Sequence, residues 1–282
     1  MIHLKSEKEI DSLRAAADLV ARTLGEVARH VRPGVSTRVL DQVAEAFIRQ
    51  SGGRPAFKGY GSPKNPFPAT LCTSVNDVVV HGIPTDLELE DGDLVSVDCG
   101  VVLDGYYGDS AFTFGVGEIG EEKARLCRVT YESLQRAVDA CMVGNRIGDI
   151  GFAVQGHCEG AGYGVVRDLV GHGIGRELHE EPSVPNFGRR GHGRRIREGL
   201  SICIEPMVNV GTSDVRTDRD GWTVRTADGQ PSAHYEHMVV IRPDGPEVLT
   251  TFQYVESAIP TLPYAAPSRA LGQRAGTAVG VS

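Results

Sequence analysis

One order of elements occurs twice along the chain, and this repeat constrains the fold more than any other feature. Apolar residues recur at helical spacing over residues 6–30, a Pro-Gly break follows, and a second helical pattern covers residues 36–53. A longer helical stretch over residues 121–142 is again followed by a break and by a shorter helix over residues 149–164. Sequence identity between the copies is slight, so the element order alone predicts an internal duplication, and two unrelated helix pairs would give the same order.

Strand-like runs follow each predicted helix pair. Turn signals at Asp104-Gly105 and Asp244-Gly245 indicate hairpins. Because hairpins and helices are segregated along the chain, the pattern favours an α+β fold over a doubly wound parallel sheet. We expect a single domain over residues 1–256, with repeats at about 6–115 and 119–252, and a flexible tail over 257–282, where Pro, Ala, Gly and Ser predominate. The runs are VVVHGI (78–83), LVSVDCGVVL (94–103), SAFTFGV (110–116), LSICIEPMV (200–208) and HYEHMVVI (234–241).

Composition excludes several classes of protein. The formal charge of −8 disfavours a protein that binds DNA or another nucleic acid through a basic face. The six cysteines lie far apart without a C-x-x-C pair, which argues against a zinc knuckle and a disulfide framework. Neither a signal-peptide core nor an apolar run long enough for a membrane span is present in the sequence, so we expect a cytoplasmic protein without a membrane partner.

A hairpin around Asp104-Gly105 would bring two aspartates together. With a two-residue turn, Leu103 pairs with Tyr106 and Gly100 with Asp109, and Asp98 then lies diagonally across from Asp109 on the same face. Two ionised carboxylates that close repel each other unless one is protonated or a cation lies between them. A solvated hairpin face is the alternative interpretation.

Two later strands each carry a glutamate among apolar residues, Glu205 and Glu236. Alone, each would be an ordinary edge-strand residue, but buried charges need partners. If both face a cavity with Asp98, Asp109 and His172, the four carboxylates balance two divalent cations, and the oxygen-rich shell with one nitrogen suits manganese, iron(II), cobalt or zinc. The glycines on either side of His172 are expected to keep side chains out of this cavity.

Across residues 3–252 the sequence resembles the type I methionine aminopeptidases, which form subfamily A of the M24 peptidases. A match to one of the following motifs would be weak evidence, but matches to all of them in this order are specific to the family. The matching stretches are CTSVNDVVVHGIP (72–84), VDCG (97–100), GDS (108–110), GHGIG (171–175), HEEP (179–182), IEPMVN (204–209), DGWTVRTADG (220–229) and YEH (235–237).

This resemblance implies a pita-bread fold of two pseudo-symmetric halves and a hydrolase that removes the initiator methionine when the second residue is small and uncharged. It implies two divalent ions per subunit (Co, Mn, Fe or Zn) and a metal-held hydroxide that attacks the scissile carbonyl. Glu205 would also accept a proton, His179 would donate to the scissile carbonyl oxygen, and His81 would contact the amide nitrogen; structural histidines are the alternative. The implied metal ligands are Asp98, Asp109, His172, Glu205 and Glu236, with Asp109 and Glu236 bridging.

An apolar pocket for the methionine side chain is implied as well. The sequence departs from the family here, because the stretch 59–72 is longer than usual and Leu178 occupies a position where an aromatic residue is common. The shape of the pocket therefore stays open. The candidate lining residues are Tyr60, Phe67, Cys72, Leu178 and Trp222.

The resemblance further implies nascent polypeptide N-termini as partners and a monomer. The arginine-rich loop 188–198 could touch ribosomal RNA transiently, but a solvated loop is strongly favoured and the loop receives no site. Two other functions stay open. One is a proline-directed peptidase on the same fold, and the other is an inactive pita-bread protein that binds peptide or RNA.

Overall fold

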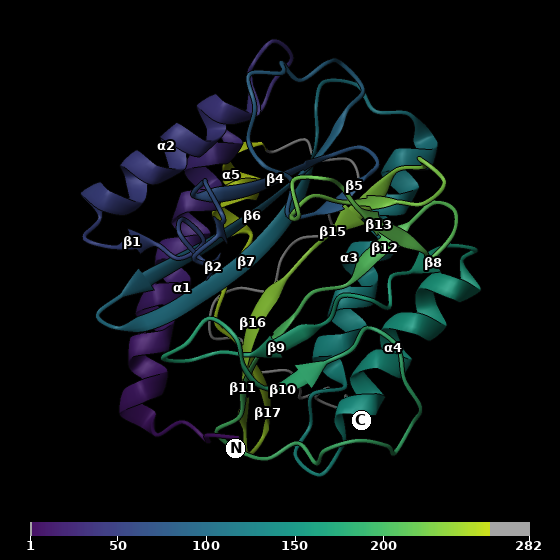
Figure 1. The fold of residues 1–282 in the computed structure, drawn as a ribbon. Coiled ribbons are helices and arrows are strands. Elements are labelled where there is room, and N and C mark those ends of the chain that lie inside the picture. Colours follow the sequence, from purple (N-terminus) through teal and green to yellow (C-terminus); the bar gives the residue numbers. More distant parts are fainter. Residues whose placement is uncertain (1, 260–282) are drawn as a thin grey trace, which may run out of the picture.

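The computed structural model describes residues 2–259, and it contains two helix pairs around antiparallel sheets (Figure 1). The predicted α+β class is confirmed, and two helix pairs around antiparallel sheets agree with the expected pita-bread fold. The helices are α1 (Glu7–Ala28), α2 (Thr37–Gln50), α3 (Glu121–Asp139), α4 (Ile147–Gly160) and α5 (Gln253–Ala258). Each predicted helix is present with ends that differ by a few residues. The expected flexible tail lies almost entirely outside the described residues.

Every strand pair recorded for these residues is antiparallel. The first half contains β1 (Arg54–Pro55), β2 (Gly61–Ser62), β3 (Asn65–Pro66), β4 (Leu71–Val75), β5 (Val78–Val80), β6 (Leu94–Leu103) and β7 (Tyr106–Gly115). The second contains β8 (Gly164–Val165), β9 (Gly171–Gly173), β10 (Glu180–Val184), β11 (Ser201–Ile204), β12 (Met207–Asn209), β13 (Val215–Thr217), β14 (Val224–Thr226), β15 (Ser232–His234), β16 (His237–Arg242) and β17 (Gly245–Val248).

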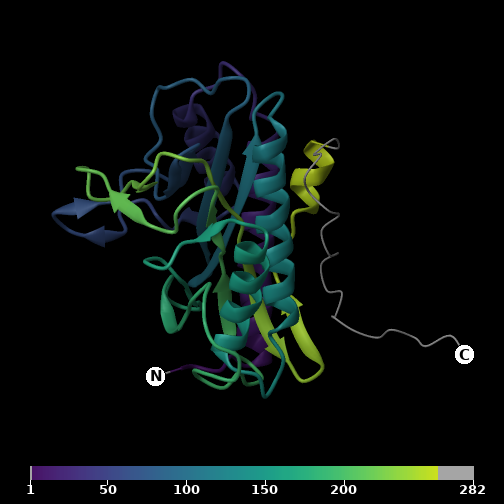
Figure 2. The same ribbon diagram turned by 90° about the vertical axis from the view of Figure 1, so that its right-hand side faces the viewer.

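The two main sheets are organised around β6 and β16. Strand β6 pairs with β1, β4 and β7, and the order of the second sheet is β10-β9-β11-β16-β17. Figure 2 shows α3 and α5 on one side of the strands, while the β2–β3 and β13–β14 hairpins project on the opposite side. Helices α3 and α5 therefore cover one face of the strands, and these two hairpins lie over the other.

Aromatic rings join the halves inside the core. Phe112 on β7 has its ring centroid 5.0 Å from that of Tyr235 and 4.8 Å from that of Phe252. Tyr131 on α3 reaches Tyr235 from the second half at 5.7 Å. All four rings are buried, so this contact fixes how the strands that carry the later site residues lie against the first half.

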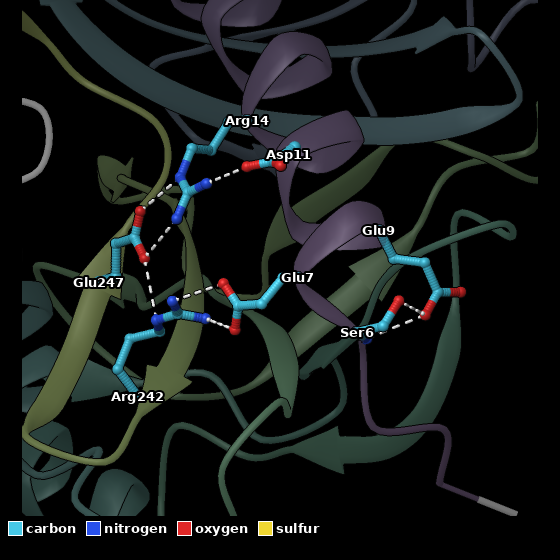
Figure 3. A network of polar contacts seen from close by, with 7 residues as sticks. All are labelled: Ser6, Glu7, Glu9, Asp11, Arg14, Arg242 and Glu247. Carbon is cyan, nitrogen blue, oxygen red and sulfur yellow. Dashed lines mark hydrogen bonds and ion pairs between the residues drawn. The ribbon is translucent and has the colours of Figure 1, made fainter.

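The start of α1 follows the sequence pattern closely. The Ser6 backbone N–H and hydroxyl donate to the Glu9 carboxylate at 2.9 and 2.8 Å, which confirms the predicted capping box (Figure 3). The Ser6 backbone N–H, the His3 imidazole at 3.0 Å and the Ser6 hydroxyl together hold the pKa of Glu9 low, at about 2. The Ser6 N–H and hydroxyl thus hold the Glu9 carboxylate in its charged form at the first turn of α1.

An ion-pair network ties α1 to the β16–β17 hairpin (Figure 3). Arg14 donates to Glu247 at 2.6 Å, and Arg242 donates to Glu7 at 2.7 Å and lies 3.4 Å from Glu247. The hairpin turn itself is shifted by one residue from the prediction, because Arg242 pairs with Gly245 and leaves Pro243-Asp244 as the turn. The network connects the N-terminal helix with a sheet of the second half.

The described part of the chain contains no helix that is both long and apolar enough to cross a bilayer.

Candidate active site

All the side chains predicted for the site line one cavity of about 170 Å³. They come from both halves of the fold, and the structure leaves none of them elsewhere. Five further apolar residues, which the sequence reasoning did not single out, complete the lining. The predicted residues are Tyr60, Phe67, Cys72, His81, Asp98, Asp109, His172, Leu178, His179, Glu205, Trp222 and Glu236, and the additional ones are Phe57, Val80, Leu169, Val170 and Met207.

Asp98 and Asp109 are placed by the β6–β7 hairpin. Leu103 pairs with Tyr106 and Gly100 with Asp109, while Asp98 is opposite Ala111. The predicted register is therefore confirmed, and the diagonal relation of the two carboxylates follows from it. Both side chains face the cavity.

Glu205 and Glu236 arrive from the second half at points where strand pairing ends. Glu205 follows β11 and precedes Pro206, which cannot donate a backbone hydrogen bond. Glu236 lies between β15 and β16, and its backbone N–H donates to the Ala111 carbonyl on β7 at 2.9 Å. This bond brings Glu236 beside the hairpin that carries the two aspartates.

The imidazole of His172 on β9 is oriented for coordination. Its Nδ1 lies 2.9 Å from the Gly173 carbonyl oxygen, a contact that requires the proton on Nδ1. The lone pair on Nε2 is then free, and this atom lies 3.6 Å from Glu205 Oε1 and 3.9 Å from Asp109 Oδ2. Burial lowers the pKa of His172 to about 3, so the ring is neutral at physiological pH and able to bind a metal.

The glycines around His172 have a different role from the one expected. A Cβ added at Gly171 would clash with the Cys203 carbonyl oxygen, and one added at Gly173 would clash with the Glu181 carbonyl oxygen. Both clashes are with the backbones of neighbouring strands rather than with the cavity. The expectation that these glycines keep the cavity open is thus wrong, and they instead allow β9 to approach β10 and β11 closely.

The four carboxylates lack compensating charge. No lysine or arginine lines the cavity among residues 2–259. Burial raises the pKa of Asp98 to about 7, and burial together with the neighbouring carboxylates raises the pKa of Asp109, Glu205 and Glu236 well above the ordinary values of these groups. Asp98 Oδ1, Asp109 Oδ1 and Glu236 Oε1 are buried and have no hydrogen-bond partner. Buried carboxylate oxygens that lack hydrogen-bond partners and positive neighbours are suitable ligands for divalent cations.

A compact donor group supports the same conclusion. Asp109, His172, Cys203 and Glu236 each offer one donor atom, and these atoms lie within 4.8 Å of one another. Cys203 did not emerge from the sequence reasoning. Its position two residues before Glu205, on the same face of an extended strand, is the signal that could have indicated it.

His81 and His179, which are predicted to contact the substrate, both line the cavity. His81 follows β5 with a φ of 59°, and burial lowers its pKa to about 4. The ring centroid of His179 is 4.3 Å from that of His172, and its Nδ1 lies 2.5 Å from the Tyr60 hydroxyl. Burial lowers the pKa of His179 as well. Neutral imidazoles offer one donor and one acceptor each.

The apolar part of the cavity is closed by aromatic residues. The Phe67 and Trp222 rings meet edge to face with centroids 5.3 Å apart, and Leu178 is buried in the same cluster. The longer stretch 59–72 forms the β2–β3 hairpin, whose Asn65 amide donates to the Asp220 carbonyl at 2.9 Å. The extra residues therefore reach the loop that carries Trp222.

One buried histidine near the acidic residues was missed. His234 Nε2 lies 3.9 Å from Glu205 Oε2 and has no hydrogen-bond partner, and burial lowers the pKa of His234 to about 3. Its spacing of two residues from Glu236 places both on one face of an extended segment. That spacing was the available signal.

Comparisons of the sequence and of the structure with known proteins agree with one another. Residues 11–243 match the model of metallopeptidase family M24. A methionine aminopeptidase of Clostridium perfringens is 53% identical over 251 residues, which cover 89% of this chain and 99% of the relative. The crystal structure of methionine aminopeptidase from Rickettsia prowazekii superposes with a TM-score of 0.86 at 41% identity, covering 89% of this chain and 100% of that one. A prolidase from Pyrococcus horikoshii, at 23% identity and a TM-score of 0.71 over 88% of this chain and 63% of the other, shares the fold.

Proposed function

The chain belongs to metallopeptidase family M24, among its methionine aminopeptidases, and we propose that it removes the initiator methionine from nascent proteins whose second residue is small and uncharged. The single observation that carries the specificity is the two-sided cavity of about 170 Å³. One side is apolar and the other holds the carboxylates and histidines. A cavity of this size accommodates one unbranched apolar side chain at the end of a peptide, and a bulky second residue would meet its wall.

The proposed metal ligands are Asp98, Asp109, His172, Glu205 and Glu236. Their fit rests on the unpartnered buried carboxylate oxygens and on the free Nε2 of His172. Four carboxylates match the charge of two divalent cations, and Co, Mn, Fe and Zn all accept this donor set. When bound, such cations act as Lewis acids that lower the pKa of water and stabilise negative charge on oxygen.

The protein's own side chains would orient the peptide. We propose that His179 donates a hydrogen bond to the scissile carbonyl oxygen, where negative charge develops, and that His81 contacts the amide nitrogen. Glu205 would accept a proton during hydrolysis in addition to binding metal. Phe67, Leu178 and Trp222 would exclude water around the methionine side chain.

The wider setting is also part of the proposal. Residues 1–256 would act as one catalytic domain, a cytoplasmic monomer whose substrates are nascent polypeptide N-termini. A transient ribosome contact would use the loop 188–198, whose exposed arginines have no acidic partner among the recorded ion pairs of the described residues.

The test compares two peptides with and without added Mn²⁺ or Co²⁺. Met-Ala-Ser should be cleaved after methionine only when metal is present, and Met-Leu-Ser should be cleaved far more slowly because its second residue is bulky. Preferred cleavage of Ala-Pro peptides would instead indicate a proline-directed peptidase, and turnover of no peptide would indicate a binding protein.

A further inference from the structure

We propose that Tyr60 is a positioning residue for His179, whose Nδ1 accepts a hydrogen bond from the Tyr60 hydroxyl so that the ring proton stays on Nε2. The inference rests on the role proposed above for His179 as a donor to the scissile carbonyl. It gives Tyr60 a role that differs from the apolar wall expected from the sequence.

The direct observation is the contact between the two side chains. The Tyr60 hydroxyl oxygen and His179 Nδ1 are 2.5 Å apart, and the ring centroids are 5.2 Å apart at 63°. A neutral imidazole carries one N–H and one acceptor nitrogen. If the phenol donates to Nδ1, the N–H must be on Nε2, and Nε2 is then the nitrogen left to donate to a substrate.

The backbone of His179 is held independently of this contact. The adjacent Glu180 carboxylate accepts the Arg176 and Glu177 backbone N–H groups at 2.8 and 3.3 Å, and the buried Lys5 ammonium donates to its other oxygen at 2.5 Å. These bonds to Glu180, one of which comes from Lys5 in the N-terminal segment, therefore hold the Cα of His179 in place. The χ2 angle of a histidine has a broad, nearly two-fold preference, so ring orientation is the freedom that Tyr60 would remove.

Tyr60 is itself fixed at the base of the β2–β3 hairpin. Its N–H donates to the Phe57 carbonyl, and its carbonyl accepts the Phe67 N–H, both at 2.8 Å. Its side chain lies at the mouth of the cavity, and the residue is 41% exposed. A residue that only lines the apolar part of the cavity needs the Tyr60 ring but not its hydroxyl. The hydroxyl points at His179, and this contact indicates the positioning role.

Nuclear magnetic resonance tests the contact without measuring turnover. The full-length chain labelled with ¹⁵N-histidine is recorded with diamagnetic Zn²⁺ present, and a His179→Gln spectrum assigns the His179 signals. We expect a protonated Nε2 and a non-protonated, hydrogen-bonded Nδ1 in the wild type. In Tyr60→Phe, the Nδ1 resonance should move toward the position of a free acceptor nitrogen. A protonated Nδ1 in the wild type, or unchanged His179 resonances in Tyr60→Phe, would overturn the proposal.

Kinetics on Met-Ala-Ser then separates positioning from binding. Tyr60→Phe keeps the ring, so KM should stay near the wild-type value while kcat falls on the order of tenfold. Tyr106→Phe is the matched control, because the Tyr106 hydroxyl accepts a hydrogen bond from Arg176 in the same segment without contacting His179. Unchanged kcat in Tyr60→Phe, or an equal loss in Tyr106→Phe, would contradict the positioning role. Failure of the wild type to cleave the peptide would contradict the proposed function instead.

Discussion

Replacing Asp98 with asparagine should stabilise the protein when metal is removed. Burial raises the pKa of Asp98 from its ordinary 3.8 to about 7, so the folded state binds a proton more tightly than the unfolded state does. The free energy of unfolding of the metal-free wild type therefore carries a penalty that develops as pH rises from about 4 to about 7 and is complete above that range. Asparagine keeps the shape of the side chain without the charge.

The size of the effect follows from the shift. One pKa unit corresponds to about 1.4 kcal/mol, so the free energy of unfolding of Asp98→Asn should exceed that of the chelated wild type by about 2 kcal/mol at pH 5 and by about 4 kcal/mol at pH 8. Urea unfolding in the presence of a chelator measures the difference at both pH values. Asp104→Asn, a change in the exposed turn of the same hairpin, is the matched control and should not show this pH dependence.

Two outcomes would refute this reasoning. Asp98→Asn could be less stable than the chelated wild type at pH 8, or the difference could be the same at pH 5 and pH 8. Either result would mean that burial does not disfavour the ionised Asp98 carboxylate in the folded protein, and the argument for cation binding from uncompensated buried charge would fail.

Three further predictions concern catalysis, the first helix and the pocket. Glu205→Gln and His172→Ala should abolish hydrolysis of Met-Ala-Ser while the circular dichroism spectrum is retained, and unchanged turnover in either variant would refute the assigned site. Ser6→Ala should lower the free energy of unfolding by about 1 kcal/mol in urea titrations because the capping box loses the Ser6 hydroxyl while the backbone N–H bond to Glu9 remains, and no change would contradict the contribution of the hydroxyl. Phe67→Ala should raise KM for Met-Ala-Ser roughly tenfold or more through lost apolar contact, and an unchanged KM would remove Phe67 from the methionine pocket.

Local patterns predicted the parts of the fold that local geometry determines. The turn at Asp104-Gly105 fixed the whole β6–β7 register, because side chains alternate with a period of two and a two-residue turn allows one pairing. The capping box at Ser6 likewise marked the start of α1. These features depend on neighbours in sequence, so the sequence is sufficient to predict them.

Contacts between segments that are distant in the sequence were harder to predict. Nothing near Gly171 in sequence indicates that the Cys203 carbonyl lies against it, because that approach depends on how β9 packs beside β11. The β2–β3 hairpin was also not predicted, since its strands have two residues each and Pro66 is in one of them. The spacing of acidic residues suggested a shared cavity, but the assignment of individual roles came from the family resemblance.

Metal content per chain tests the central claim most directly. Wild-type protein passed through gel filtration after loading with Mn²⁺ or Co²⁺ should retain two divalent ions per chain by elemental analysis, while Asp109→Asn should retain fewer and lose activity in parallel. A wild type that retains no metal, or an Asp109→Asn variant that retains as much metal as the wild type, would contradict the account.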